Sequence, residues 1–173
     1  MNIDNINNSF PSIKDLFYAQ SFDDKSKTFC SFMKEIKSDM KIFNKLSLSL
    51  AEKIKQSKSN IDIFVSVPKF IDESNEIDYS KILAQTLSKE LNIPYRNNAI
   101  IKIKKTKKLK TLSQEERLQE IDSAFKINLN NNLRVCIVDD VLSSGATLQE
   151  IIKTFSINNI QNVSIAILIL QNY

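Results

Sequence analysis

The residues best suited to chemistry follow the apolar run 135–138. Two adjacent carboxylates come first, and a group of small and hydroxyl-bearing residues comes next: Asp139 and Asp140, then Ser143, Ser144, Gly145, Ala146 and Thr147. Serine and threonine hydroxyls, and the N–H groups at the start of a helix, bind phosphate oxygens. Carboxylates repel phosphate, but they accept hydrogen bonds from sugar hydroxyls and they bind Mg²⁺. Both kinds of group within one loop predict a sugar-phosphate site.

Gly145 is the only glycine among the 173 residues. At average usage, a chain of this length would contain roughly a dozen. A sequence that avoids glycine so strongly should keep it where the backbone needs positive φ or where a ligand presses against it. We therefore expect the backbone at Gly145 to lie close to the bound phosphate.

A less specific interpretation of the same residues is an ordinary strand, turn and helix. The carboxylates would then be solvated, and Ser144 or Thr147 would only cap the helix. For a generic Asp-Asp pair we would prefer this interpretation. Here the strand, both carboxylates, both serines, the glycine and the threonine occur together in order, which favours the ligand site. The sequence has neither the GxxxxGK of a P-loop nor the several glycines of a dinucleotide-binding fingerprint.

Hydrophobic periodicity predicts the elements that would position this loop. Helices are expected at residues 26–56, in two pieces separated near 39–44, at 79–91 after an Asp78 N-cap, at 113–121 with a capping box, and at 148–155. Strands are expected at 61–67, 99–103, 135–138 and 163–170. This alternation predicts a three-layer α/β fold, in which helices cover both faces of a central, mainly parallel sheet. Ligands of such sheets bind beyond the carboxyl ends of the strands.

Length and composition predict a single domain over residues 1–173, with residues 1–24 flexible, N-terminal helices at 25–58 and the core at 59–173. No basic-then-apolar leader is present, and the longest apolar stretch, Ile165–Leu170, is too short to span a bilayer, so we expect a cytoplasmic protein without a membrane partner. Cys30 and Cys136 are far apart and histidine is absent. These two facts argue against a disulfide framework, Ser-His catalysis and a His-ligated metal.

The stretch Val135–Thr147 resembles the signature with which type I phosphoribosyltransferases bind 5-phosphoribosyl-1-pyrophosphate (PRPP). From about Lys37 onward the chain resembles one branch, the ComF family of competence proteins. The residues that match this family's upstream segment are Thr106, Leu112, Ser113, Arg117, Ala124 and Phe125, and Val65–Lys69 resembles its Val-Pro loop. The chain lacks the family's N-terminal zinc-binding cysteine module. It also has Ile77-Asp78-Tyr79 in place of Gly-Phe-Asn, Leu109 in place of Gln and Glu120 in place of Asn.

The resemblance implies a type I phosphoribosyltransferase-like fold with extra N-terminal helices, and it implies a role for each site residue. Asp139 and Asp140 would hold the ribose hydroxyls and Mg²⁺, and residues Ser143, Ser144, Gly145, Ala146 and Thr147 would wrap the 5′-phosphate. Ser66 and Lys69 would face the pyrophosphate, with Lys69 supplying positive charge. The expected catalytic residues are therefore Asp139, Asp140 and Lys69.

Two classes of function remain open at this point. One is an enzyme that transfers phosphoribose from PRPP to an unidentified acceptor and releases pyrophosphate. The other is a non-catalytic protein that senses PRPP or handles single-stranded DNA. An acceptor-binding hood would separate them, and only the N-terminal helices offer material for one. Neither the acceptor nor the oligomeric state follows from these residues.

Six lysines lie between Lys102 and Lys110. They would form a solvated surface loop, a loop that closes over pyrophosphate, or a patch that binds single-stranded DNA. Binding of single strands usually also needs exposed aromatic side chains. The nearest aromatic residues, Tyr95 and Phe125, are expected at a turn and in the core instead.

Overall fold

The computed structural model describes residues 13–22, 27–69, 77–107, 112–130 and 132–171. Within them, four strands form one parallel sheet in the order β1 (Ile13–Phe22), β6 (Val163–Gln171), β5 (Val135–Leu142) and β2 (Ile63–Ser66). Two short strands, β3 (Ile100–Lys102) and β4 (Phe125–Ile127), pair antiparallel beside it. Strand β6 is buried along its whole length, as expected of a central strand with helices on both faces.

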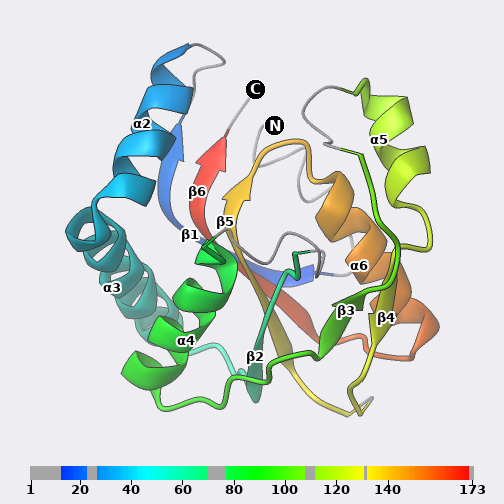
Figure 1. Cartoon of the computed structure of the whole chain (residues 1–173). Helices are drawn as coiled ribbons and strands as arrows, with labels where there is room; N and C mark the ends of the chain where they lie inside the picture. The colour runs from blue at the N-terminus through cyan, green and yellow to red at the C-terminus, as the bar shows by residue number, and fades with distance from the viewer. Residues whose placement is uncertain (1–12, 23–26, 70–76, 108–111, 131, 172–173) are drawn as a thin grey trace.

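In the described part of the chain, five helices surround the sheet (Figure 1). They are α2 (Lys27–Ser38), α3 (Met40–Ser57), α4 (Tyr79–Leu91), α5 (Gln114–Ile121) and α6 (Ala146–Ile157). Helices α2, α3 and α4 cover one face, and α6 covers the other, so the predicted three layers are confirmed. None of the described helices is both long enough and apolar enough to cross a membrane.

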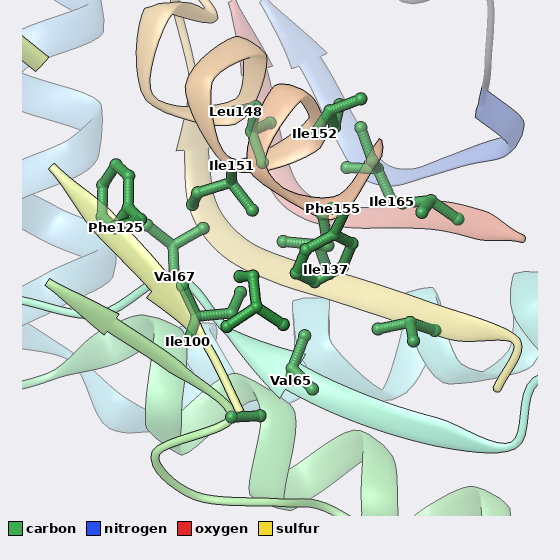
Figure 2. Packing of buried hydrophobic residues seen from close by; sticks show 14 of the residues in the cluster. Val65, Val67, Ile100, Phe125, Ile137, Leu148, Ile151, Ile152, Phe155 and Ile165 are labelled. Atoms are coloured by element: carbon green, nitrogen blue, oxygen red, sulfur yellow. The ribbon is translucent and has the colours of Figure 1, made fainter. Parts of the chain in front are cut away.

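Two separate hydrophobic clusters hold the layers together, one on each face of the sheet. On the α6 face, Ile151 and Phe155 lie over Ile137 and Ile165 of the sheet (Figure 2). On the opposite face, residues of α2, α3 and α4 enclose Phe64, Cys136 and Ala166. Each fully buried large apolar side chain contributes about 1.5–3 kcal/mol. The two clusters together fix where the carboxyl end of β5 lies relative to its helices.

The two helix starts predicted from capping residues are confirmed, whereas α6 begins at Ala146, two residues before the predicted start. The Asp78 side chain accepts a hydrogen bond of 3.0 Å from the backbone N–H of Lys81 at the start of α4. Ser113 and Glu116 form both hydrogen bonds of a capping box at the start of α5. The two N-terminal helices are separated at Asp39, which caps α3.

Two expectations need correction, and one strand was missed. Residues Ile13–Phe22 were expected to be flexible, but they form edge strand β1, because the exposed polar backbone edge of β6 offers them a parallel partner. Strand β5 was expected to end at Val138, but its pairing with the long apolar β6 continues to Leu142 and includes both aspartates. Strand β4 was not predicted, since it is only three residues long and depends on pairing with β3.

An ion pair at the start of β2 and β5 provides a test of the sheet. Asp62 accepts hydrogen bonds from the Arg134 guanidinium and from its backbone N–H, next to the Ile63–Val135 pair. These bonds lower the pKa of Asp62 to about 2. Because the folded-state pKa lies below the unfolded one, the stabilisation is present above the ordinary pKa of Asp and is lost as the pH falls towards about 2.

Asp62→Asn should therefore destabilise the protein at neutral pH and have little effect at a pH of about 2, where Asp62 is itself becoming protonated. The free energy of unfolding in urea, measured for the wild type and for Asp62→Asn at neutral pH and at a pH of about 2, gives this difference. Asp122→Asn, which removes the exposed partner of Lys153, is the control, and it should cost less because that pair joins no strands. An Asp62→Asn penalty of equal size at both pH values would contradict this assignment.

Candidate functional site

A cavity of about 990 Å³ lies at the carboxyl end of β5. One part of its wall is the unbroken segment 139–147. Another is a single face of α2, formed by Phe29, Cys30, Met33, Lys34, Lys37 and Ser38. Arg117 of α5 and Gln171 of β6 complete the described lining. In Figure 1 the segment after β5 lies between α2 and α5. The structure therefore brings the predicted loop together with cationic and apolar residues from distant parts of the chain.

The turn after β5 leads directly into the N-terminus of α6. Gly145 is the N-cap residue, with φ of 75° and ψ of −3°, and α6 begins at Ala146. No side-chain hydrogen bond caps this helix among the described residues, so the interpretation of Ser144 or Thr147 as mere caps is wrong. The N–H groups in the first turn of a helix lack partners within the helix and attract anions. This end of the cavity is therefore suited to a phosphate group.

The positive φ of Gly145 is not sufficient to explain why this position is glycine. Five other described residues adopt positive φ without being glycine: Lys58, Asn92, Asn98, Ser123 and Asn159. Gly145 differs from them in being buried in the cavity wall beside the start of α6. A side chain here would occupy space next to the N–H groups of the helix. The absence of a Cβ atom is thus what this position requires, together with the backbone conformation.

Asp139 is held by a helix side chain and by the backbone of the next residue. The Ser80 hydroxyl of α4 donates a hydrogen bond of 2.7 Å to the Asp139 carboxylate, and the backbone N–H of Asp140 donates one of 2.9 Å. Burial raises the pKa of Asp139 well above its usual range, the negative charge of Asp140 adds to this, and the bond from Ser80 opposes it. The charged form of Asp139 is therefore disfavoured in the cavity, and a bound cation or hydroxyl donors would stabilise it.

Asp140 is tied to the opposite helix. The Lys37 ammonium of α2 lies 2.5 Å from a carboxylate oxygen of Asp140. Tyr79 holds the same lysine, because the ammonium lies 5.0 Å from the centroid of its ring and its hydroxyl donates to the Lys37 carbonyl oxygen at 2.5 Å. Sequence reasoning missed Lys37 and Ser80, since nothing in the local sequence marks either one as a neighbour of residues about a hundred or sixty positions away.

Ser66 and Lys69 are not among the described residues that line this cavity. Ser66 lies at the end of β2, paired with Val138, and its hydroxyl is 3.0 Å from that of Tyr95. The Lys69 ammonium donates a hydrogen bond of 2.7 Å to the carbonyl oxygen of Ile77. Their assignment to the pyrophosphate stays a prediction.

The lysine-rich segment lies only partly within the described residues, because 108–111 fall outside them. The Lys102 ammonium donates to the Thr106 hydroxyl at 2.7 Å, and the Lys107 backbone N–H donates to Glu120 at 2.9 Å. Phe125 is 5% exposed and belongs to the core, as expected. The three interpretations of this segment remain untested.

The acidic residues of the cavity fit a magnesium ion that takes its remaining ligands from water or from a bound phosphate. In the described part of the chain, no group of three or more His, Cys, Asp or Glu side chains could hold a metal by itself. Mg²⁺ commonly binds to one or two carboxylates and takes its remaining ligands from water and substrate phosphates. Asp139 and Asp140 offer that donor set beside the turn that leads into α6.

The described fold is a parallel sheet with a helix N-terminus and paired carboxylates at its carboxyl edge. The chain belongs to the phosphoribosyl transferase domain family, which it matches over residues 77–172, more than half its length. The structure of adenine phosphoribosyltransferase from Leishmania tarentolae shares the fold, with a TM-score of 0.50 and 13% sequence identity over 79% of this chain and 74% of that one.

A particular relative is Competence protein F of Haemophilus influenzae, which is 40% identical over 76 residues. This alignment covers 42% of the chain and 33% of the relative, so the chain spans about a third of the length of the curated protein it matches. The resemblance to ComF proteins is confirmed over the aligned part.

Gly145→Val should weaken phosphate binding and also destabilise the fold by about 1–2 kcal/mol, because a left-handed conformation is unfavourable for a residue with a Cβ atom. Gly145→Asn separates the two effects, since asparagine tolerates this conformation but still introduces a side chain. We expect Gly145→Asn to unfold close to wild type in urea and yet to bind PRPP at least tenfold more weakly. Normal binding by both variants would show that the glycine is not needed for the ligand.

Proposed function

We propose that this cavity binds PRPP together with Mg²⁺ and that the protein transfers the phosphoribosyl group to an acceptor. The observation that supports this most strongly is the unbroken lining from Asp139 to Thr147. It has two carboxylates at one end and an uncapped helix N-terminus at the other. A ligand that spans it needs hydroxyl groups near the carboxylates and a phosphate near the helix.

The phosphate end is formed by the turn and the first residues of α6. The N–H groups there, with the hydroxyls of Ser143, Ser144 and Thr147, would bind the oxygens of the 5′-phosphate. Gly145 and Ala146 are both buried, and they keep this part of the wall free of large side chains. Positive charge from Arg117 on the same cavity would add to the attraction for a phosphorylated ligand.

The carboxylate end would orient the sugar. Asp139 and Asp140 would accept hydrogen bonds from ribose hydroxyls and would hold Mg²⁺, which, when bound, neutralises charge on the pyrophosphate. In the transfer, the bond between ribose C1 and the pyrophosphate oxygen breaks, and the pyrophosphate keeps the electron pair. The acceptor then forms a bond to C1. Such a reaction depends mostly on positioning and on charge stabilisation, so the lack of histidine is no obstacle.

The acceptor would lie against α2. This helix contributes the apolar side chains of Phe29 and Met33 to the cavity wall, both mostly buried. They could exclude water from the sugar while an acceptor packs against them. The N-terminal helices thus supply a wall of the kind an acceptor hood needs, and this supports an enzyme over a sensor.

The second class of function is a non-catalytic protein that senses PRPP or handles single-stranded DNA. The competence name of the relative and the lysines of segment 102–110 support it. Against it, residues 102–107 include no aromatic side chain, and the neighbouring Phe125 is buried. We therefore place this candidate second. A salt-dependent gel shift with an oligonucleotide would test it.

Combined Asp139→Asn and Asp140→Asn should abolish Mg²⁺-dependent binding of PRPP and leave the protein folded. The pKa of Asp139 is raised in the folded state, which means that its charge costs stability as the pH rises above the ordinary value. A neutral amide of the same shape removes that cost at neutral pH. Equilibrium dialysis with radiolabelled PRPP measures binding, and circular dichroism confirms the fold.

Asp122→Asn is the matched control, because it removes a carboxylate that is paired with Lys153 and does not line the cavity. It should bind PRPP like the wild type. If the folded double variant still binds PRPP with wild-type affinity, the assignment of the site to these carboxylates is wrong.

A further inference from the structure

Within the described residues, the ion pair between Lys37 and Asp140 is the one charged interaction between α2 and the segment 139–147. The ammonium nitrogen lies 2.5 Å from the carboxylate oxygen, and the side chains are 38% and 18% exposed. Lys37 lies in the last turn of α2, outside the residues 77–172 that match the phosphoribosyl transferase domain. It is thus a feature that the family match does not account for.

The lysine is held in place from a second direction. Its ammonium lies over the ring of Tyr79 at 5.0 Å, a distance at which a cation is attracted to the face of an aromatic ring. The Tyr79 hydroxyl donates to the backbone carbonyl of Lys37, and the Tyr79 ring packs against Phe43 of α3 at 5.5 Å. Lys37 is therefore oriented towards Asp140 rather than extended freely into solvent.

The ammonium contacts a carboxylate oxygen of Asp140 that a divalent cation would also use. Two cations within about 4 Å of each other repel strongly in a partly buried setting. The ammonium at its present distance therefore opposes the binding of a divalent cation to this carboxylate. If the ammonium moves away when a divalent cation binds, it is still on a residue that lines the cavity.

We propose that Lys37 is a built-in counter-ion that competes with the divalent cation for Asp140 and so sets how much free cation the site requires. The inference rests on the proposed function, since the cation is the one that accompanies PRPP. Without ligand, the ion pair holds α2 against the segment 139–147. The bound cation replaces it, and the released ammonium becomes available to an anionic group of the ligand.

The test measures binding of Mn²⁺ alone to the full chain, by electron paramagnetic resonance of the free ion, with Asp140→Asn as the background. Lys37→Met should bind Mn²⁺ about threefold more tightly than wild type. Lys34→Met is the matched control, because it removes the same charge from the same face of α2, one turn away. Within the described residues, Lys34 forms no ion pair. It should change the affinity much less. Lys37→Arg, which keeps a cation beside Asp140, should stay close to wild type.

Equal Mn²⁺ affinity in wild type, Lys37→Met and Lys34→Met would overturn the proposal, as would the absence of binding to Lys37→Met. Lys37→Gln provides the same comparison if Lys37→Met does not fold, and urea unfolding shows which variants are folded. The experiment contains no PRPP, so its failure can be distinguished from a failure of the proposed function. Failure of the wild type to bind PRPP would reject the function and leave the Mn²⁺ result intact.

Discussion

The parallel pairing of β5 with β6 is the interaction on which the site depends. The pairing runs from Val135–Val163 to Leu142–Leu170 and so carries the β structure through both aspartates. Their backbone is therefore fixed by a buried sheet on one side of the site, and the turn that follows is fixed by α6, whose Ile151 and Phe155 belong to the core. A loop anchored at both ends in this way can keep carboxylates close together and helix N–H groups uncapped without collapsing.

The helices on the other face of the sheet complete the site. Ser80 of α4 bonds to Asp139, and Lys37 of α2 pairs with Asp140, so each carboxylate is held by a different helix. The ion pair between Lys37 and Asp140 has two effects. It satisfies a half-buried charge when no ligand is present, and it brings the apolar face of α2 over the place where a sugar would bind. The proposed ligand binding and the stability of the ligand-free protein would thus make different demands on the same carboxylate.

Much of the fold could be predicted, because its strongest signals are local. The Asp78 and Ser113 caps, the helical periodicity before Asp39 and the apolar run Val163–Leu170 each need only neighbouring residues. The elements that were not predicted depend instead on residues distant in sequence. Strand β1 and the extension of β5 through Asp139 and Asp140 exist because β6 lies beside them, and no pattern within those segments indicates this partner.

The same distinction applies to the site. The glycine and the two aspartates could be singled out from sequence, since they are adjacent to one strand. Lys37 and Ser80 could not, since only the folded chain brings them to the carboxylates. The comparison of Gly145 with the asparagines at positive φ adds a further point. The physical reason for a rare residue type at one position becomes clear only once its neighbours in space are known.

Calorimetric titration of the unmodified protein with PRPP, with and without Mg²⁺, is the most direct test of PRPP binding in this cavity. We expect saturable binding that Mg²⁺ strengthens, with ribose 5-phosphate binding more weakly at the same site and competing with PRPP. The absence of any heat of binding with PRPP, with and without Mg²⁺, would contradict the assignment of PRPP to the site at the end of β5.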